Sequence, residues 1–86
     1  MSVESFMNEK GFAAGSSGGG CEWYTKDFTY KGKPAFLAIT DNGGMDLPTS
    51  MDEPVIVGVY CLETEELIEQ PKPYNSMQAA LEDFGI

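Results

Sequence analysis

The segment from Val55 to Leu62 limits the fold of this chain more than any other part of the sequence. It reads Val-Ile-Val-Gly-Val-Tyr-Cys-Leu and contains no charged side chain. Its β-branched and aromatic residues favour an extended strand. A run that is apolar at both odd and even positions is typical of a strand covered on both faces. We therefore predict that this strand lies inside a sheet and not at its edge.

Two further strands are predicted upstream, over residues 23–30 and Ala35–Thr40. Lys31-Gly32 between them suits a tight hairpin turn, since glycine adopts positive φ at no steric cost. A two-residue turn pairs Phe28 with Ala35. Alternation along the strands then places these residues on one face: Tyr24, Phe28, Tyr30, Ala35, Leu37 and Ile39. The other face receives Trp23, Thr25, Asp27, Thr29, Phe36 and Ala38.

The middle and the end of the chain contain strong turn signals. Asp41-Asn42-Gly43-Gly44 is the clearest of them, and a loop is predicted from Met45 to Glu53. Residues 63–66 predict another turn, followed by a short return strand over Leu67–Gln70. Pro71 and Pro73 are expected to end that strand, because proline cannot donate a ladder hydrogen bond.

Helices are predicted at both ends of the sequence. The first spans Ser2–Lys10, with Ser2 as N-cap and Gly11 as left-handed C-cap, after which Phe12 packs back onto Met7. Residues 13–20, rich in glycine and serine, are expected to be a flexible connection.

The second helix is expected to begin after an Asn75 cap and to end at Gly85, with Gln78 at the capping-box position. Its apolar stripe consists of Met77, Ala80, Leu81 and Phe84. Together the elements predict an α+β fold: one domain over residues 1–86, built as a small two-layer domain. Its sheet is a three- to four-stranded antiparallel meander, with an N-terminal and a C-terminal helix.

The charge balance excludes several classes of function. Fourteen acidic residues stand against five lysines, with no Arg and no His, and the net charge is −9. Such a chain repels phosphate backbones and anionic membranes, so direct nucleic-acid or membrane binding is not expected. Without His there is no imidazole base and no His metal ligand. We therefore expect no enzymatic activity and no cofactor, and we expect a basic protein partner.

Compartment and redox state follow from further absences in the sequence. No apolar run approaches the roughly 18 residues of a membrane-spanning helix, and no cationic segment is followed by an apolar one as in a signal peptide. A cytoplasmic location is therefore expected. Cys21 and Cys61 are expected to be reduced thiols, with Cys61 buried in a strand.

The densest acidic patch consists of Glu63, Glu65, Glu66 and Glu69. Alternate residues on one face of a strand lie about 6.6–6.8 Å apart, near twice the 3.4 Å rise between phosphates on one DNA strand. This spacing suggests mimicry of nucleic acid by an inhibitor that occupies a basic groove on another protein. The alternative is an ordinary solvated edge.

Three aromatic residues, Trp23, Phe36 and Tyr60, are candidates for partner binding. Aromatic side chains are enriched at binding hot spots but are equally normal in cores. If both helices cover one face of the sheet, some of these rings lie on the opposite face. There they would suit a basic, partly apolar partner.

An alternative function uses the loop between the second and third predicted strands. Asp41, Asp46, Asp52 and Glu53 surround this loop, and hard cations prefer clustered carboxylates. Their spacing does not match a calcium-binding loop. The leading hypothesis is therefore a small non-enzymatic interaction module, and the competing one is a small ligand- or divalent-metal-binding domain.

Overall fold

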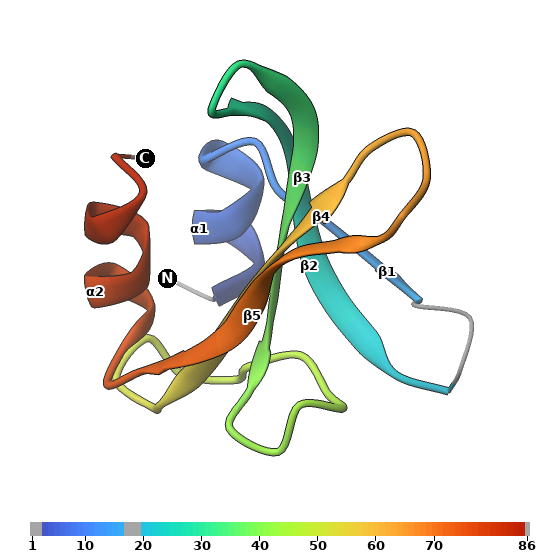
Figure 1. Cartoon of the computed structure of the whole chain (residues 1–86). Helices are drawn as coiled ribbons and strands as arrows, with labels where there is room; N and C mark the ends of the chain where they lie inside the picture. Colours follow the sequence, from blue (N-terminus) through green and yellow to red (C-terminus); the bar gives the residue numbers. More distant parts are fainter. Residues whose placement is uncertain (1–2, 17–19, 86) are drawn as a thin grey trace.

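The computed structural model describes residues 3–16 and 20–85. The elements follow in the order α1 (Val3–Glu9), β1 (Ala13–Ser16), β2 (Glu22–Tyr30), β3 (Lys33–Asp41), β4 (Val55–Cys61), β5 (Leu67–Tyr74) and α2 (Met77–Asp83). The strands form one five-stranded sheet in which each strand pairs antiparallel with the next. Both helices lie on the same side of this twisted sheet (Figure 1). The α+β fold class is therefore correct, and the sheet has more strands than predicted.

The central hairpin has the predicted register. Phe28 pairs with Ala35, and Lys26 pairs with Leu37. Lys31 and Gly32 both have positive φ, 51° and 82°, as a two-residue turn that matches the twist of the strands requires. The strand β4 lies between β3 and β5, as its apolar sequence predicted.

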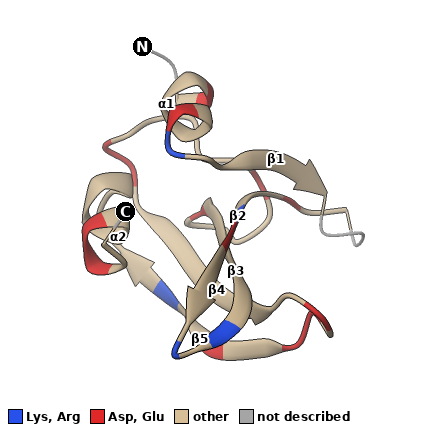
Figure 2. Cartoon of the chain, turned by 90° about the horizontal axis from the view of Figure 1, so that it is seen from above, with Lys and Arg blue, Asp and Glu red and all other residues tan. Residues whose placement is uncertain are grey.

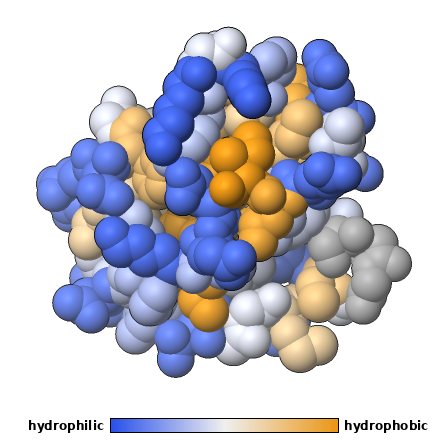
Figure 3. Space-filling view, viewed as in Figure 1, coloured by the Kyte–Doolittle hydropathy of each residue, from blue (hydrophilic) through white to orange (hydrophobic). Residues whose placement is uncertain are grey.

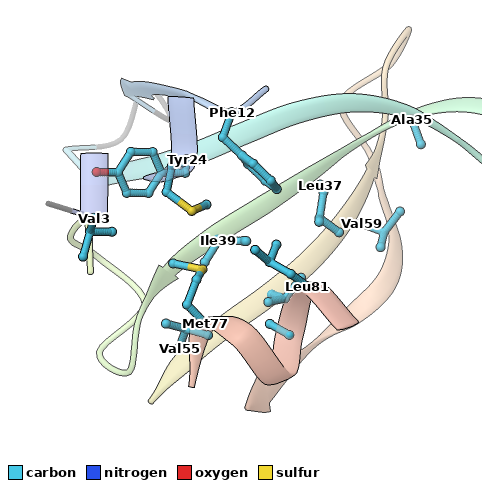
Figure 4. Close-up of a cluster of buried hydrophobic side chains, with 13 residues drawn as sticks. Val3, Phe12, Tyr24, Ala35, Leu37, Ile39, Val55, Val59, Met77 and Leu81 are labelled. Atoms are coloured by element: carbon cyan, nitrogen blue, oxygen red, sulfur yellow. The ribbon is translucent and has the colours of Figure 1, made fainter. Parts of the chain in front are cut away.

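The hydrophobic core fills the space between the sheet and the helices. The inward side of β3 and β4 contributes four almost completely buried residues, Leu37, Ile39, Val57 and Val59. Side chains of both helices complete the core (Figure 4), and these are Val3, Met7, Met77, Ala80 and Leu81. Burial of such side chains is the main stabilising contribution in a domain of this size.

The N-terminal helix ends as predicted. Gly11 has φ +91°, and the Phe12 N–H donates to the Met7 carbonyl at 2.8 Å, which brings the Phe12 ring into the core. The proposed N-cap, Ser2, lies outside the described residues.

The predicted flexible connection over residues 13–20 is wrong in its first half. Ala13–Ser16 form β1, which pairs with β2 from Ala13–Thr25 to Ser16–Glu22. Backbone hydrogen bonds to a neighbouring strand determined this element, and small residues with weak β-propensity did not prevent it. Residues 17–19 lie outside the described part.

Two details at the C-terminal end also differ from the prediction. The strand β5 continues through Pro71 and Pro73 to Tyr74, because proline is tolerated at a sheet edge, where no further strand needs its N–H. The N-cap of α2 is Ser76, whose hydroxyl accepts from the Ala79 N–H at 3.2 Å, and not Asn75. Gly85, with φ +72°, follows the helix end.

Candidate functional site

The side of the sheet opposite the helices, which we call the open face, gathers the three predicted aromatic residues. Phe36 and Tyr60 are directly opposite each other on β3 and β4, and their rings stack at 5.2 Å with an interplanar angle of 11°. Trp23 on β2 packs against both rings, with centroids 5.8 Å from Phe36 and 5.4 Å from Tyr60. Phe36 is buried beneath this contact, while Trp23 and Tyr60 are half-buried.

A hollow of about 400 Å³ lies on the open face beside these rings. Trp23 and Tyr60 form its walls, and Ala38 and Gly58, which pair across β3 and β4, belong to its lining. The hollow exists because this central pair is small. A Cβ atom at Gly58 would lie 3.1 Å from Cε1 of Tyr60, which is closer than ordinary van der Waals contact.

Sequence reasoning missed the small residues of the hollow. Gly58 interrupts an otherwise continuous run of large apolar residues, and an isolated glycine inside a strand indicates a bulge or a close approach. That signal was present in the sequence. Which bulky residues border the space depends on the register of three strands, and this information is not local.

Charge is distributed unevenly between the two faces of the sheet. The lysines at positions 26, 33 and 72 are cross-strand partners of residues on the helix-covered face and lie on that face themselves. Lys31 lies in the β2–β3 turn. Lys10 lies directly after α1. All five lysines fall within the described residues, and none of them belongs to the open face, whereas Asp27 sits on it opposite Phe36. Figure 2 shows this scarcity of basic residues against many acidic ones on the helices and loops.

The four glutamates do not form one strand-spaced row. Glu63, Glu65 and Glu66 lie in the exposed turn between β4 and β5, and Glu65 has φ +61°. Glu69 lies on β5 opposite Val59, on the helix-covered face. The strand spacing that suggested nucleic-acid mimicry therefore does not apply to these side chains.

Glu69 is engaged by neighbours within the chain. The Tyr30 hydroxyl donates to Glu69 Oε1 at 2.9 Å, and Lys31 Nζ lies 3.4 Å from the same oxygen. The hydrogen bond from Tyr30, followed by the contacts with Lys31, lowers the pKa of the Glu69 carboxyl. This carboxylate therefore links β5 to Tyr30 and Lys31 at one end of the sheet and is not part of the open face.

The acidic loop between β3 and β4 does not gather its four carboxylates. Asp41 Oδ1 accepts from the Gly43 N–H at 3.0 Å, and Glu53 Oε1 accepts from the backbone N–H groups of Thr49 and Ser50. In the described part of the chain, no group of three or more Asp, Glu or Cys side chains could hold a metal ion, and Asp46 and Asp52 belong to no such group. Asp41 and Glu53 thus stabilise turns of the loop.

Exposed apolar residues accompany the acidic β4–β5 turn. Leu62, Leu67 and Ile68 flank this turn and are exposed, and Leu67 pairs with Tyr60 on the open face. In the view of Figure 3, hydrophobic residues gather near the middle of the surface with hydrophilic ones around them. Apolar and acidic side chains therefore lie close together at this end of the sheet.

The cysteines differ partly from expectation. Cys61 is half-buried at the end of β4, so its predicted burial is wrong, and Cys21 is half-buried at the rim of the hollow. No disulfide joins them within the described residues.

Over residues 3–16 and 20–85, neither helix has the length and apolar character needed to cross a membrane.

Comparison of the chain with known protein families, with curated proteins and with solved structures gave no significant match. The candidate function is therefore argued from the geometry and chemistry of the open face.

Proposed function

We propose that this chain is a small non-enzymatic interaction module that binds a basic protein partner through its open face. The observation that carries the proposal is the cluster of Trp23, Phe36 and Tyr60 on a sheet surface without any lysine. Aromatic residues in partly buried clusters are the usual energetic centres of protein interfaces. The surrounding acidic residues attract a basic partner and select against acidic ones.

The two contributions have different roles in binding. The aromatic rings supply affinity, because a hot-spot side chain contributes about 2 kcal/mol or more when truncation to alanine is measured. The net charge of −9 supplies long-range attraction, which accelerates association and weakens as salt increases. A partner whose basic surface otherwise binds nucleic acid would be inhibited by such binding.

The experiment compares partner capture by three forms of the full chain, wild type, Trp23→Ala and Tyr74→Phe. Native lysate is applied at about 50 mM and about 300 mM salt, between which the Debye length falls from about 14 Å to about 6 Å. We expect a basic protein that wild type and Tyr74→Phe retain, that Trp23→Ala loses, and that high salt weakens. Circular dichroism checks that the variants are folded.

Two results would overturn the proposal. Capture that is equal for wild type and Trp23→Ala would exclude the open face as the binding surface. An acidic partner, or retention independent of salt, would exclude charge attraction as a contribution.

A further inference from the structure

The floor of the hollow restricts how a partner segment can bind there. Ala38 and Gly58 belong to β3 and β4, each of which has a neighbouring strand on both sides. Ala38 pairs with Thr25 on one side and with Gly58 on the other, and Gly58 lies between β3 and β5 where the β4–β5 register shifts. A partner therefore cannot bind at this place by adding a strand, since strand addition needs a free sheet edge.

The walls of the hollow offer rings and hydrogen-bond donors. The indole N–H of Trp23 can only donate, and the Tyr60 hydroxyl can donate as well as accept. Within residues 3–16 and 20–85 neither group donates a hydrogen bond to another residue, although both rings take part in the aromatic cluster. The complementary segment is apolar and presents carbonyl acceptors.

Proline-rich segments have this combination of properties. Proline has a carbonyl acceptor but no backbone N–H to satisfy. Its polyproline II conformation needs no hydrogen bonds to other strands and loses little entropy on binding. Aromatic-lined grooves are the general recognition mode for such segments.

Acidic residues beyond the aromatic rings determine what flanks the prolines. Asp27 lies in the same cross-strand row as Phe36 and Tyr60, and Leu67 continues that row toward the turn that carries Glu63, Glu65 and Glu66. With no lysine on this face, the cationic partner residues meet attraction only. Lys or Arg beside the prolines fits this arrangement.

We propose that the open-face hollow beside the rings of Trp23 and Tyr60 binds a basic, proline-rich segment of the partner. This inference rests on the proposed function and specifies its partner. The proline rings stack on Trp23 and Tyr60, the two ring donors bind the carbonyls of the segment, and the flanking cations lie toward Asp27 and the β4–β5 turn.

The test is a selection from phage-displayed random peptides of about twelve residues, which allow about four turns of a polyproline II helix. The full chain is the bait, and Trp23→Ala is the counter-selection bait. We expect enrichment of peptides that combine prolines with Lys or Arg. The emission of Trp23, the single tryptophan of the chain, then measures the affinity of each synthesised peptide.

Single substitutions on the two faces of the sheet show which residues contact the peptide. Tyr60→Phe removes a hydroxyl from the hollow and should weaken peptide binding about 5-fold, the effect of one hydrogen bond. Tyr74→Phe removes a hydroxyl from the helix-covered side and should leave the affinity unchanged. Gly58→Val displaces the Tyr60 ring from its place beside the hollow, because a Cβ atom there would lie 3.1 Å from Cε1 of Tyr60, and should weaken binding by about 30-fold or more, as for loss of a hot-spot residue.

The outcomes separate this inference from the function on which it rests. Basic peptides without enriched proline, including helical ones, would overturn the inference and leave the proposed function intact. Enriched peptides that are neither basic nor proline-rich, or an absence of enrichment over the Trp23→Ala bait, would overturn both. Basic proline-rich peptides that bind Gly58→Val as tightly as wild type would place binding outside the hollow and overturn the inference alone.

Discussion

Two successive cross-strand pairs of β3 and β4 lie on opposite faces of the sheet. Leu37 and Val59 face the helices and are 0% and 1% exposed. Their chain neighbours Phe36 and Tyr60 face the other way, and there the rings of Tyr60 and Trp23 pack against Phe36. One face is buried by a separate layer of helices, whereas the other is covered by its own aromatic side chains. The first arrangement serves stability, and the second leaves a surface that a partner can complete.

The largest expected effect comes from the helix-covered face. Leu37→Ala removes a fully buried side chain and should lower the free energy of unfolding by about 2–5 kcal/mol, measured by urea denaturation. Leu62→Ala, at a site 41% exposed, is the matched control and should change it by about 0.5 kcal/mol or less. Equal effects of the two variants would contradict the burial difference.

Substitutions on the open face should lower the free energy of unfolding less than those on the helix-covered face. Trp23→Ala removes two ring contacts from a half-buried position and should cost about 1–2 kcal/mol in the free energy of unfolding. The same urea measurement applies. A loss as large as that of Leu37→Ala would mean that the aromatic cluster is a second core and not a binding surface.

The cap of α2 tests how strongly the helix layer depends on local structure. Ser76→Ala removes the hydroxyl that accepts from the Ala79 N–H and should cost about 1 kcal/mol. Asn75→Ala, at the neighbouring residue that the sequence favoured as cap, should cost much less. The reverse order in thermal or urea unfolding would place the cap at Asn75.

The last expected effect is a dependence of stability on pH, which appears only in alkaline solution. Tyr74 packs against the core and donates to Asp83 Oδ2 at 2.5 Å, and burial followed by this hydrogen bond raises the pKa of Tyr74 to about 12 from 10.0. The folded state therefore keeps a proton that the unfolded state loses near pH 10. The resulting stabilisation is complete below pH 10 and declines as the pH rises toward 12.

Tyr74→Phe checks this pH dependence. The unfolding temperature of wild type should fall more steeply than that of Tyr74→Phe between pH 10 and about 12. Parallel curves for the two proteins would show that Tyr74 titrates alike in the folded and unfolded states.

Local patterns predicted the elements whose neighbours lie nearby in the sequence. Lys31-Gly32 determined the β2–β3 register, because a two-residue turn leaves one pairing for the flanking strands. Gly11 ended α1 for the same local reason, since glycine adopts positive φ readily. The three aromatic candidates followed from alternation along strands, although their joint contact needed the β3–β4 pairing as well.

These errors arose where the arrangement of strands in the sheet decided the outcome. Ala13–Ser16 became a strand because β2 offered its edge, and Pro71 and Pro73 remained in β5 because that strand is the last of the sheet. Glu69 was grouped with the turn glutamates in the sequence, yet Tyr30 and Lys31 engage it on the other face. Tyr30 and Glu69 are 39 positions apart in the sequence.

The sequence by itself determined the net charge of −9, the lack of Arg and His, the alternating strands and the end of α1 at Gly11. These properties depend on composition and on residues within a few positions of one another. Only the tertiary structure decided that the three aromatic rings share one face with a hollow, and that the lysines lie away from it. Those features depend on which strands are neighbours and which face the helices cover, because packing of the whole chain selects that face.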